Sequence, residues 1–154
     1  MNRKNNKILI SVLIVFAIFK ASIATSQCSI SVTSIAFNNY DVFSDNPVDS
    51  EGTVSISCTK DVVKAFVTIG TSSNSGVINP RRMKQLSGND FLDYNLFSDV
   101  TRTSVLGTTR IQFKRPTGKP APWTDSMTIY ARIDSRQDVS AGSYSDLVSV
   151  TIDW

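Results

Sequence analysis

The sequence contains no histidine and only two cysteines among its 154 residues. Histidine is the commonest general base and the commonest zinc ligand, so its absence excludes a Ser-His-Asp or Cys-His enzyme. A zinc site made of two cysteines and carboxylates has no spacing motif to support it. We therefore expect a protein that is not an enzyme and that binds no metal and no cofactor. The length indicates about one domain.

Long apolar runs are also scarce, and the single one lies near the N-terminus. It covers residues 8–19, follows three basic residues, and precedes a segment of small residues. This order is typical of a secretory signal peptide. The alternative, a membrane anchor, needs roughly 20 apolar residues. We predict a signal peptide over residues 1–26, cleaved after Ala24 or Ser26, and no membrane span in the mature chain.

The excess of positive charge belongs to this leader. Four of the 16 basic residues and none of the 13 acidic ones lie in residues 1–26, so cleavage changes the net charge from +3 to −1. A protein that binds nucleic acid is therefore not expected. Two basic clusters remain, Arg81-Arg82 with Lys84 and Lys114-Arg115, and both are interpreted as solvated loop charges.

Cys28 and Cys58 are expected to form a disulfide, because the chain is exported and the cysteine count is even. The alternative is a pair of free, buried thiols. In the chain-entropy model a loop of this size stabilises the fold by about 3–4 kcal/mol. The bond would tie the first strand of the mature chain, 27–154, to the rest of the domain.

Apolar and polar residues alternate through most of the mature chain, with turn residues between the runs. This period of two indicates strands, and no stretch keeps a helical period. About seven or eight short strands in one domain favour an all-β sandwich. The expected strands lie in residues 29–37, 53–58, 63–69, 92–96, 111–113, 127–133 and 148–154.

The acidic residues do not form a recognisable site. Asp93, Asp99 and Asp125 are interpreted as isolated turn residues. The acidic stretch over residues 41–51 lacks the spacing and the glycine of an EF-hand loop. Trp123 follows a proline-rich loop and is interpreted as a lid on the core, with a loop-tip contact residue as the alternative.

Five motifs occur in an order that resembles the spore coat protein U domain family, which includes subunits of archaic, Csu-type chaperone–usher pili. Ala131 stands where the family usually has glycine, and the match covers nearly all of residues 27–154. The motifs are Cys28-Ser-Ile-Ser-Val32 with Phe37-Asn-Asn-Tyr40, Gly52-Thr-Val-Ser-Ile-Ser-Cys58, Leu92-Asp-Tyr94-Asn-Leu96-Phe97-Ser-Asp99-Val-Thr-Arg102, Tyr130-Ala-Arg132-Ile133, and Gly142-Ser-Tyr144-Ser-Asp146 before Val148-Ser-Val150-Thr-Ile152.

The resemblance implies an immunoglobulin-like pilin fold that lacks its last strand. A periplasmic pilus chaperone would fill the resulting groove first, and a strand from another pilin or coat subunit would fill it after passage through an outer-membrane usher. Strand addition of this kind uses an exposed sheet edge. The apolar face of the terminal strand is expected to border the groove, besides contributing to the core: Val148, Val150, Ile152 and Trp154.

The implied function is that of a structural or adhesive subunit of a secreted fibre or coat at the cell surface. The alternative is a self-contained, secreted β-sandwich that binds carbohydrate or another surface. Cleavage after Ala24 or Ser26 leaves at most three residues before Cys28. An ordinary strand needs roughly 5–10 residues. The subunit is therefore expected to accept a strand without donating one, as a tip subunit would.

Overall fold

The computed structural model describes residues 27–118 and 121–154. The predicted signal peptide, residues 1–26, lies outside the described residues. Within the described ranges the chain forms nine strands and no helix. They are β1 (Cys28–Val32), β2 (Val48–Cys58), β3 (Lys64–Ser72), β4 (Arg81–Gln85), β5 (Phe91–Phe97), β6 (Ile111–Lys114), β7 (Trp123–Ile133), β8 (Tyr144–Ser145) and β9 (Val148–Asp153).

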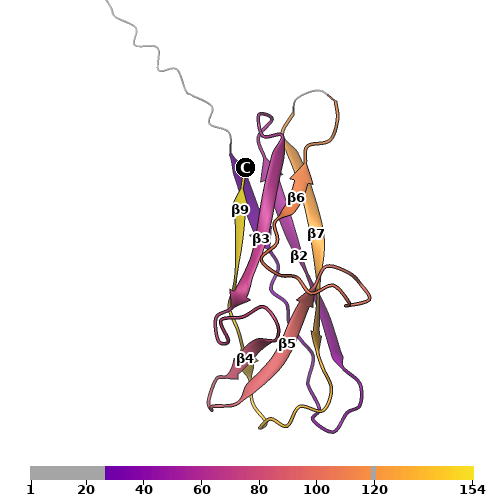
Figure 1. Cartoon of the computed structure of the whole chain (residues 1–154), viewed down its shortest axis with the longest axis vertical. Coiled ribbons are helices and arrows are strands. Elements are labelled where there is room, and N and C mark those ends of the chain that lie inside the picture. Colours follow the sequence, from indigo (N-terminus) through magenta and orange to yellow (C-terminus); the bar gives the residue numbers. More distant parts are fainter. Residues whose placement is uncertain (1–26, 119–120) are drawn as a thin grey trace, which may run out of the picture.

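Two antiparallel sheets pack against each other in an elongated sandwich (Figure 1). One sheet has six strands in the order β1-β2-β7-β5-β4-β8, and the other has three in the order β6-β3-β9. The longest pairing joins β2 to β7 from Val48↔Ile133 to Cys58↔Trp123. The C-terminus lies at the end of the sandwich where β1 begins (Figure 1).

The alternation in the sequence fixes which face of each strand is buried. In β2, Val54 and Ile56 are buried, whereas Ser57 is exposed on the other face. The same period of two buries alternate residues of β3 and β7, as expected for antiparallel sheets with one face in the core. The core formed in this way includes Val54, Ile56, Ala65, Val67, Ile69, Leu92, Tyr94, Leu96, Ile129, Ala131 and Ile133.

The disulfide and Trp123 secure the end of the sandwich where β1 begins. Cys28 and Cys58, the pair predicted from the sequence, are bonded and lie opposite each other in the β1–β2 register. The Trp123 indole is buried, and its Nε1 donates a hydrogen bond to the Val62 carbonyl at 2.8 Å. Trp123 is therefore a lid on the core and not a loop-tip contact.

After β1 the chain leaves the edge of β2 and continues without regular strand structure through residues 33–39. It passes closely over Gly52, where a Cβ atom would lie 2.7 Å from Ile35 Cγ1 and 3.1 Å from the Thr33 carbonyl oxygen. The Thr33 amide still donates to the Thr53 carbonyl at 2.9 Å. The expected strand over residues 29–37 therefore ends earlier, at Val32.

The chain also changes sheets between β8 and β9. Strand β8 pairs with β4 in the larger sheet, whereas β9 pairs with β3 in the smaller one. The β3–β9 register shifts between Ile69↔Val150 and Ser72↔Val148, so β3 has one residue more than β9 over this interval, as in a β-bulge. Bulges bend the strand that carries them, and this one lies where β9 begins.

Two strands were not predicted from the sequence, β4 and β8. The basic cluster that starts at Arg81 forms β4, so its interpretation as solvated loop charge is wrong for Arg81, which is fully buried. Its guanidinium donates to the carbonyl oxygens of Ile78, Gly70 and Leu106 at 2.9–3.0 Å. These bonds replace the water that a buried arginine loses.

Candidate functional site

Two sheet edges face each other on one side of the sandwich. Strand β1 pairs only with β2, and β9 pairs only with β3, so each is an outermost strand among those described. The two strands also pack close to each other without pairing. An outermost strand presents a row of unpaired N–H and C=O groups that can accept a further strand.

A groove of about 380 Å³ opens between these edges. One side is formed by residues 32–37, which we call the β1-side wall. The other side is formed by residues 144–150, which we call the β9-side wall. The floor is formed by side chains from four strands of both sheets: Ile69, Met83, Tyr94, Leu96 and Ile129. Met83 is partly exposed, and the other four floor residues are buried.

Asp146 fixes the crossing from β8 to β9 and lines the groove. Its Oδ1 accepts hydrogen bonds from the Ser73 amide at 3.1 Å, the Ser73 hydroxyl at 2.9 Å and Asn74 Nδ2 at 3.0 Å. Its Oδ2 accepts a hydrogen bond from the Tyr94 hydroxyl at 2.8 Å. Burial, followed by this contact with Asp146, raises the pKa of Tyr94 above its ordinary value.

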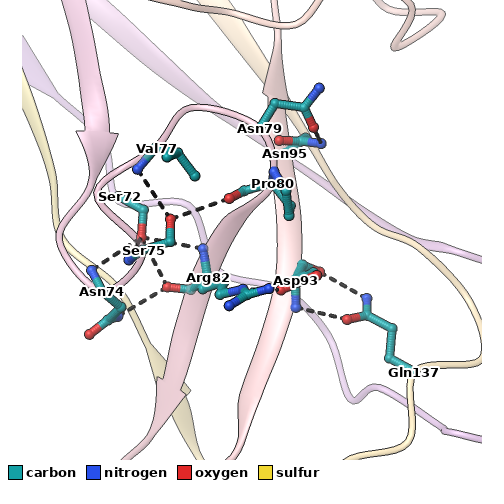
Figure 2. Close-up of polar contacts among 10 residues, drawn as sticks. All are labelled: Ser72, Asn74, Ser75, Val77, Asn79, Pro80, Arg82, Asp93, Asn95 and Gln137. Carbon is teal, nitrogen blue, oxygen red and sulfur yellow. Dashed lines mark hydrogen bonds and ion pairs between the residues drawn. The ribbon is translucent and has the colours of Figure 1, made fainter.

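The loop between β3 and β4 contains Ser73 and Asn74, which bind Asp146. Ser72, at the end of β3, orders this loop (Figure 2). The buried Ser72 hydroxyl oxygen accepts hydrogen bonds from the amides of Asn74, Ser75 and Arg82 at 3.1–3.3 Å. Asn74 Nδ2 also donates to the Arg82 carbonyl at 3.0 Å. The position of Asp146 therefore depends on a compact set of short polar side chains.

Arg81 lies opposite Tyr94 in the β4–β5 register. Burial lowers the pKa of this arginine, against the attraction of Tyr94 and Asp146. Its Nε has no hydrogen-bond partner among the described residues. A buried cation with incomplete hydrogen bonding is costly, so the three carbonyl contacts and the nearby carboxylate of Asp146 are needed to keep it in place.

The four residues predicted to border the groove do not lie together. Val148 and Val150 line the groove and are half-buried. Ile152 is half-buried opposite Val67 of β3 and lies outside the groove lining. Trp154 is 54% exposed and lies with Asp61–Lys64 around a separate hollow near the C-terminus.

Sequence reasoning missed the β1-side wall, Tyr94 and Asp146. Ile35 and Phe37 are apolar positions in a segment rich in serine and threonine, which predicts a strand, and Phe37 also belongs to a family motif, but neither signal indicates the wall of a groove. Tyr94 and Asp146 both lie within family motifs. They are 52 residues apart in the sequence, and no local signal predicts that they are in direct contact.

The carboxylates stabilise turns and sheet surfaces. Asp99 accepts hydrogen bonds from the Thr101 hydroxyl and from the amides of Thr103 and Ser104, the latter two at 3.1 and 2.7 Å. These bonds, that of Thr101 first, lower the pKa of Asp99. Asp49 forms a two-point ion pair with Arg132 at 2.7 and 2.9 Å. No group of three metal-ligating side chains occurs in residues 27–118 and 121–154. No helix in these residues is long and apolar enough to cross a membrane.

Comparison with known proteins shows the family of this chain. Residues 15–151 match the family model described as the Spore Coat Protein U domain. The chain is also similar to Protein U of Myxococcus xanthus, with 30% identity over 109 residues that cover 66% of this chain. It spans 58% of the length of that protein.

A solved structure with a similar fold is the complex of CsuC with CsuE, a chaperone–tip adhesion subunit pre-assembly complex from archaic chaperone–usher Csu pili of Acinetobacter baumannii. The TM-score is 0.60 at 23% identity, and the match covers 84% of this chain and 40% of the other. The likeness confirms the predicted all-β, immunoglobulin-like class. This chain belongs to the Spore Coat Protein U domain family and has the fold of a pilin-like β-sandwich.

Proposed function

We propose that this protein is an exported, non-catalytic subunit of a chaperone–usher fibre or coat, and that it accepts a strand from a partner in the groove between β1 and β9. The observation that carries this proposal is the pair of facing outermost strands with an apolar floor between them. A strand added along β9 would pair its backbone and place alternate side chains on that floor.

The shape of the groove limits which part of an incoming strand is bound most tightly. Strand β9 has six residues, and only its first half, at Val148 and Val150, lines the groove. Burying one aliphatic side chain there contributes roughly 1.5–3 kcal/mol. We therefore expect an incoming strand to carry its apolar residues where they face Val148 and Val150, with weaker demands opposite Ile152 and Trp154.

The partners follow from the family and from the fold. The solved relative is a subunit held by its chaperone, and by analogy we propose a periplasmic chaperone, an outer-membrane usher and other pilin or coat subunits as partners. The proposed location is a fibre or coat at the cell surface. We propose either a structural or an adhesive role for the subunit in that fibre or coat.

The place in the fibre depends on where the leader is cleaved. Cleavage after Ala24 or Ser26 leaves too few residues before Cys28 to form a donor strand. The subunit would then accept a strand and not donate one, as at a fibre tip. N-terminal sequencing of the exported chain checks the cleavage site, and a regular ladder of oligomers made from this subunit alone would contradict the tip position.

Periplasmic expression of the chain with and without a chaperone of the chaperone–usher class tests the main proposal. We expect a soluble one-to-one complex with the chaperone, and degradation or aggregation without it, because the two outermost strands leave unpaired backbone groups beside the groove. A monodisperse monomer that melts cooperatively without the chaperone would instead support a self-contained binding module.

A further inference from the structure

Tyr94 contacts both walls of the groove. Its ring meets the ring of Phe37 edge-on, with the centroids 6.0 Å apart at 71°, and Phe37 belongs to the β1-side wall. Its hydroxyl donates to Asp146 Oδ2 at 2.8 Å, and Asp146 belongs to the β9-side wall. One side chain on the floor thus links two segments that belong to different sheet edges.

Each wall also forms hydrogen bonds on its own side of the molecule, while β1 and β9 pack close to each other without pairing. The β1-side wall is bonded to β2 through the Thr33 amide to the Thr53 carbonyl at 2.9 Å and through the Ser50 hydroxyl to the Ala36 carbonyl at 2.7 Å. The β9-side wall is bonded to the β3–β4 loop through Ser73, whose amide donates to the Leu147 carbonyl at 2.9 Å. These hydrogen bonds do not cross the groove.

The link through Tyr94 is well shielded. Tyr94 is 8% exposed, and its neighbour Arg81 is fully buried. Burial and the contact with Asp146 raise the pKa of the phenol, so the hydroxyl remains a donor throughout the ordinary pH range. An edge-on ring contact and a hydrogen bond to a charged acceptor are both directional, so the link resists changes in the separation of the walls.

We infer that Tyr94 is a positioning residue that holds the β1-side and β9-side walls at a fixed separation where Phe37 and Asp146 line the groove. A groove whose width is set in advance loses less conformational freedom when it is filled. This consequence for strand binding rests on the proposed function, whereas the coupling of the two walls does not.

Hydrogen exchange of single amides tests the inference. Native and Tyr94→Phe chains are compared in the same form, alone or held by the chaperone, with Thr33 reporting on the β1-side wall and Ser73 on the β9-side wall. Tyr94→Phe keeps the ring and removes only the hydroxyl. We expect both reporters to exchange about tenfold faster, while the core amides of Val54 and Ile129 change by less than about twofold.

Asp146 supplies the rescue arm of the test. Asp146→Asn retains a polar partner for the Tyr94 hydroxyl and should leave exchange at Thr33 close to that of the native chain. Asp146→Ala removes the partner and should accelerate exchange at Thr33, although Thr33 lies on the opposite wall. This pair of variants also decides the question if Tyr94→Phe does not fold.

Tyr40 gives a matched control for the loss of a phenol. Its hydroxyl donates to the Asp134 carbonyl at 3.0 Å and accepts the Gln137 amide at 2.7 Å, and it does not line the groove. Tyr40→Phe should accelerate exchange at Gln137 and leave Thr33 and Ser73 unchanged.

Three outcomes would overturn the inference. Acceleration at Ser73 alone would mean that the walls move independently. Equal acceleration at all amides, Val54 and Ile129 included, would mean that Tyr94 only stabilises the whole fold. No change at either wall would mean that the hydroxyl does not link them. Because the measurement needs no incoming strand, it can succeed even if the proposed strand-accepting function fails.

Discussion

Ile35 lies directly over Gly52, so closely that a Cβ atom on residue 52 would stand 2.7 Å from Ile35 Cγ1. This contact is what lets the chain after β1 cross the edge of β2 and form one wall of the groove. The Thr33 carbonyl oxygen lies 3.1 Å from the same position, so backbone as well as side chain would have to move.

Gly52→Ala is therefore expected to lower the free energy of unfolding by about 1–3 kcal/mol, the usual cost of overpacking. Urea unfolding of the oxidised chain measures it. Gly142→Ala is the control, because the three atoms nearest to a Cβ atom there all belong to the side chain of Gln85. Its effect should be smaller than that of Gly52→Ala, because a side chain can move where the backbone at Thr33 cannot. Equal effects of the two variants would contradict the role of the Gly52–Ile35 contact.

The bond between Cys28 and Cys58 is expected in the exported protein. Non-reducing mass analysis should show the loss of two hydrogen atoms, and the unreduced protein should not react with a thiol probe. Replacing both cysteines by serine should lower the free energy of unfolding by about 3–4 kcal/mol. Stoichiometric labelling of the folded, unreduced protein would contradict the bond.

Val150 and Thr151 are neighbours in β9 that face opposite ways, half-buried at the groove and exposed on the outer face. Val150→Asp places a charge in the groove, so we expect it to abolish capture by the chaperone in a co-purification assay. Thr151→Asp adds the same charge to the exposed face and should leave most of the capture intact. Equal loss for both variants would indicate that the groove is not where the chaperone binds.

The ion pair between Asp49 and Arg132 should contribute to the loss of stability in acid. The hydrogen bond from Arg132 lowers the pKa of Asp49 in the folded state, against the effect of burial. A lowered folded-state pKa stabilises the fold above the unfolded value of about 3.9, and this contribution is lost as the pH falls through the folded value. Asp49→Asn should flatten the curve of stability against pH below about pH 4.

A control for this titration is Asp153→Asn, because Asp153 forms only an exposed pair with Arg110 at 3.3 Å. Exposed pairs of this kind contribute little to stability. Urea unfolding between neutral pH and the acid range should separate the two variants. An unchanged acid slope in Asp49→Asn would contradict the role of Asp49.

Much of the fold could be predicted from the sequence, because the period of two reports directly which face of a strand is buried. The burial of Val54 and Ile56 in β2 and of Ile129 and Ile133 in β7 follows that pattern. The pattern fails for β4, where the buried Arg81 donates to the carbonyl of Ile78, three residues away, and to the more distant carbonyls of Gly70 and Leu106. Such partners leave no trace in the local sequence.

The candidate site was harder to predict than the fold. Val148 and Val150 share a face with Ile152, and alternation alone cannot tell which of them meets a groove and which packs against β3. That distinction depends on the bulge at Ser72 and on the crossing at Asp146, which are set by contacts between separate parts of the chain. The β1-side wall depends in the same way on the fit between Gly52 and Ile35.

The crossing from β8 to β9 places a hydrogen-bonded turn at the start of β9, among the residues that line the groove. A segment that entered along β9 from the direction of the C-terminus would run up against the turn at Asp146 and Leu147, which is tied to Ser73 and Tyr94. Sheet pairing alone tolerates slippage by two residues, since side chains then return to the same face. A physical stop removes that ambiguity, so an incoming strand would be aligned by where its leading residue halts.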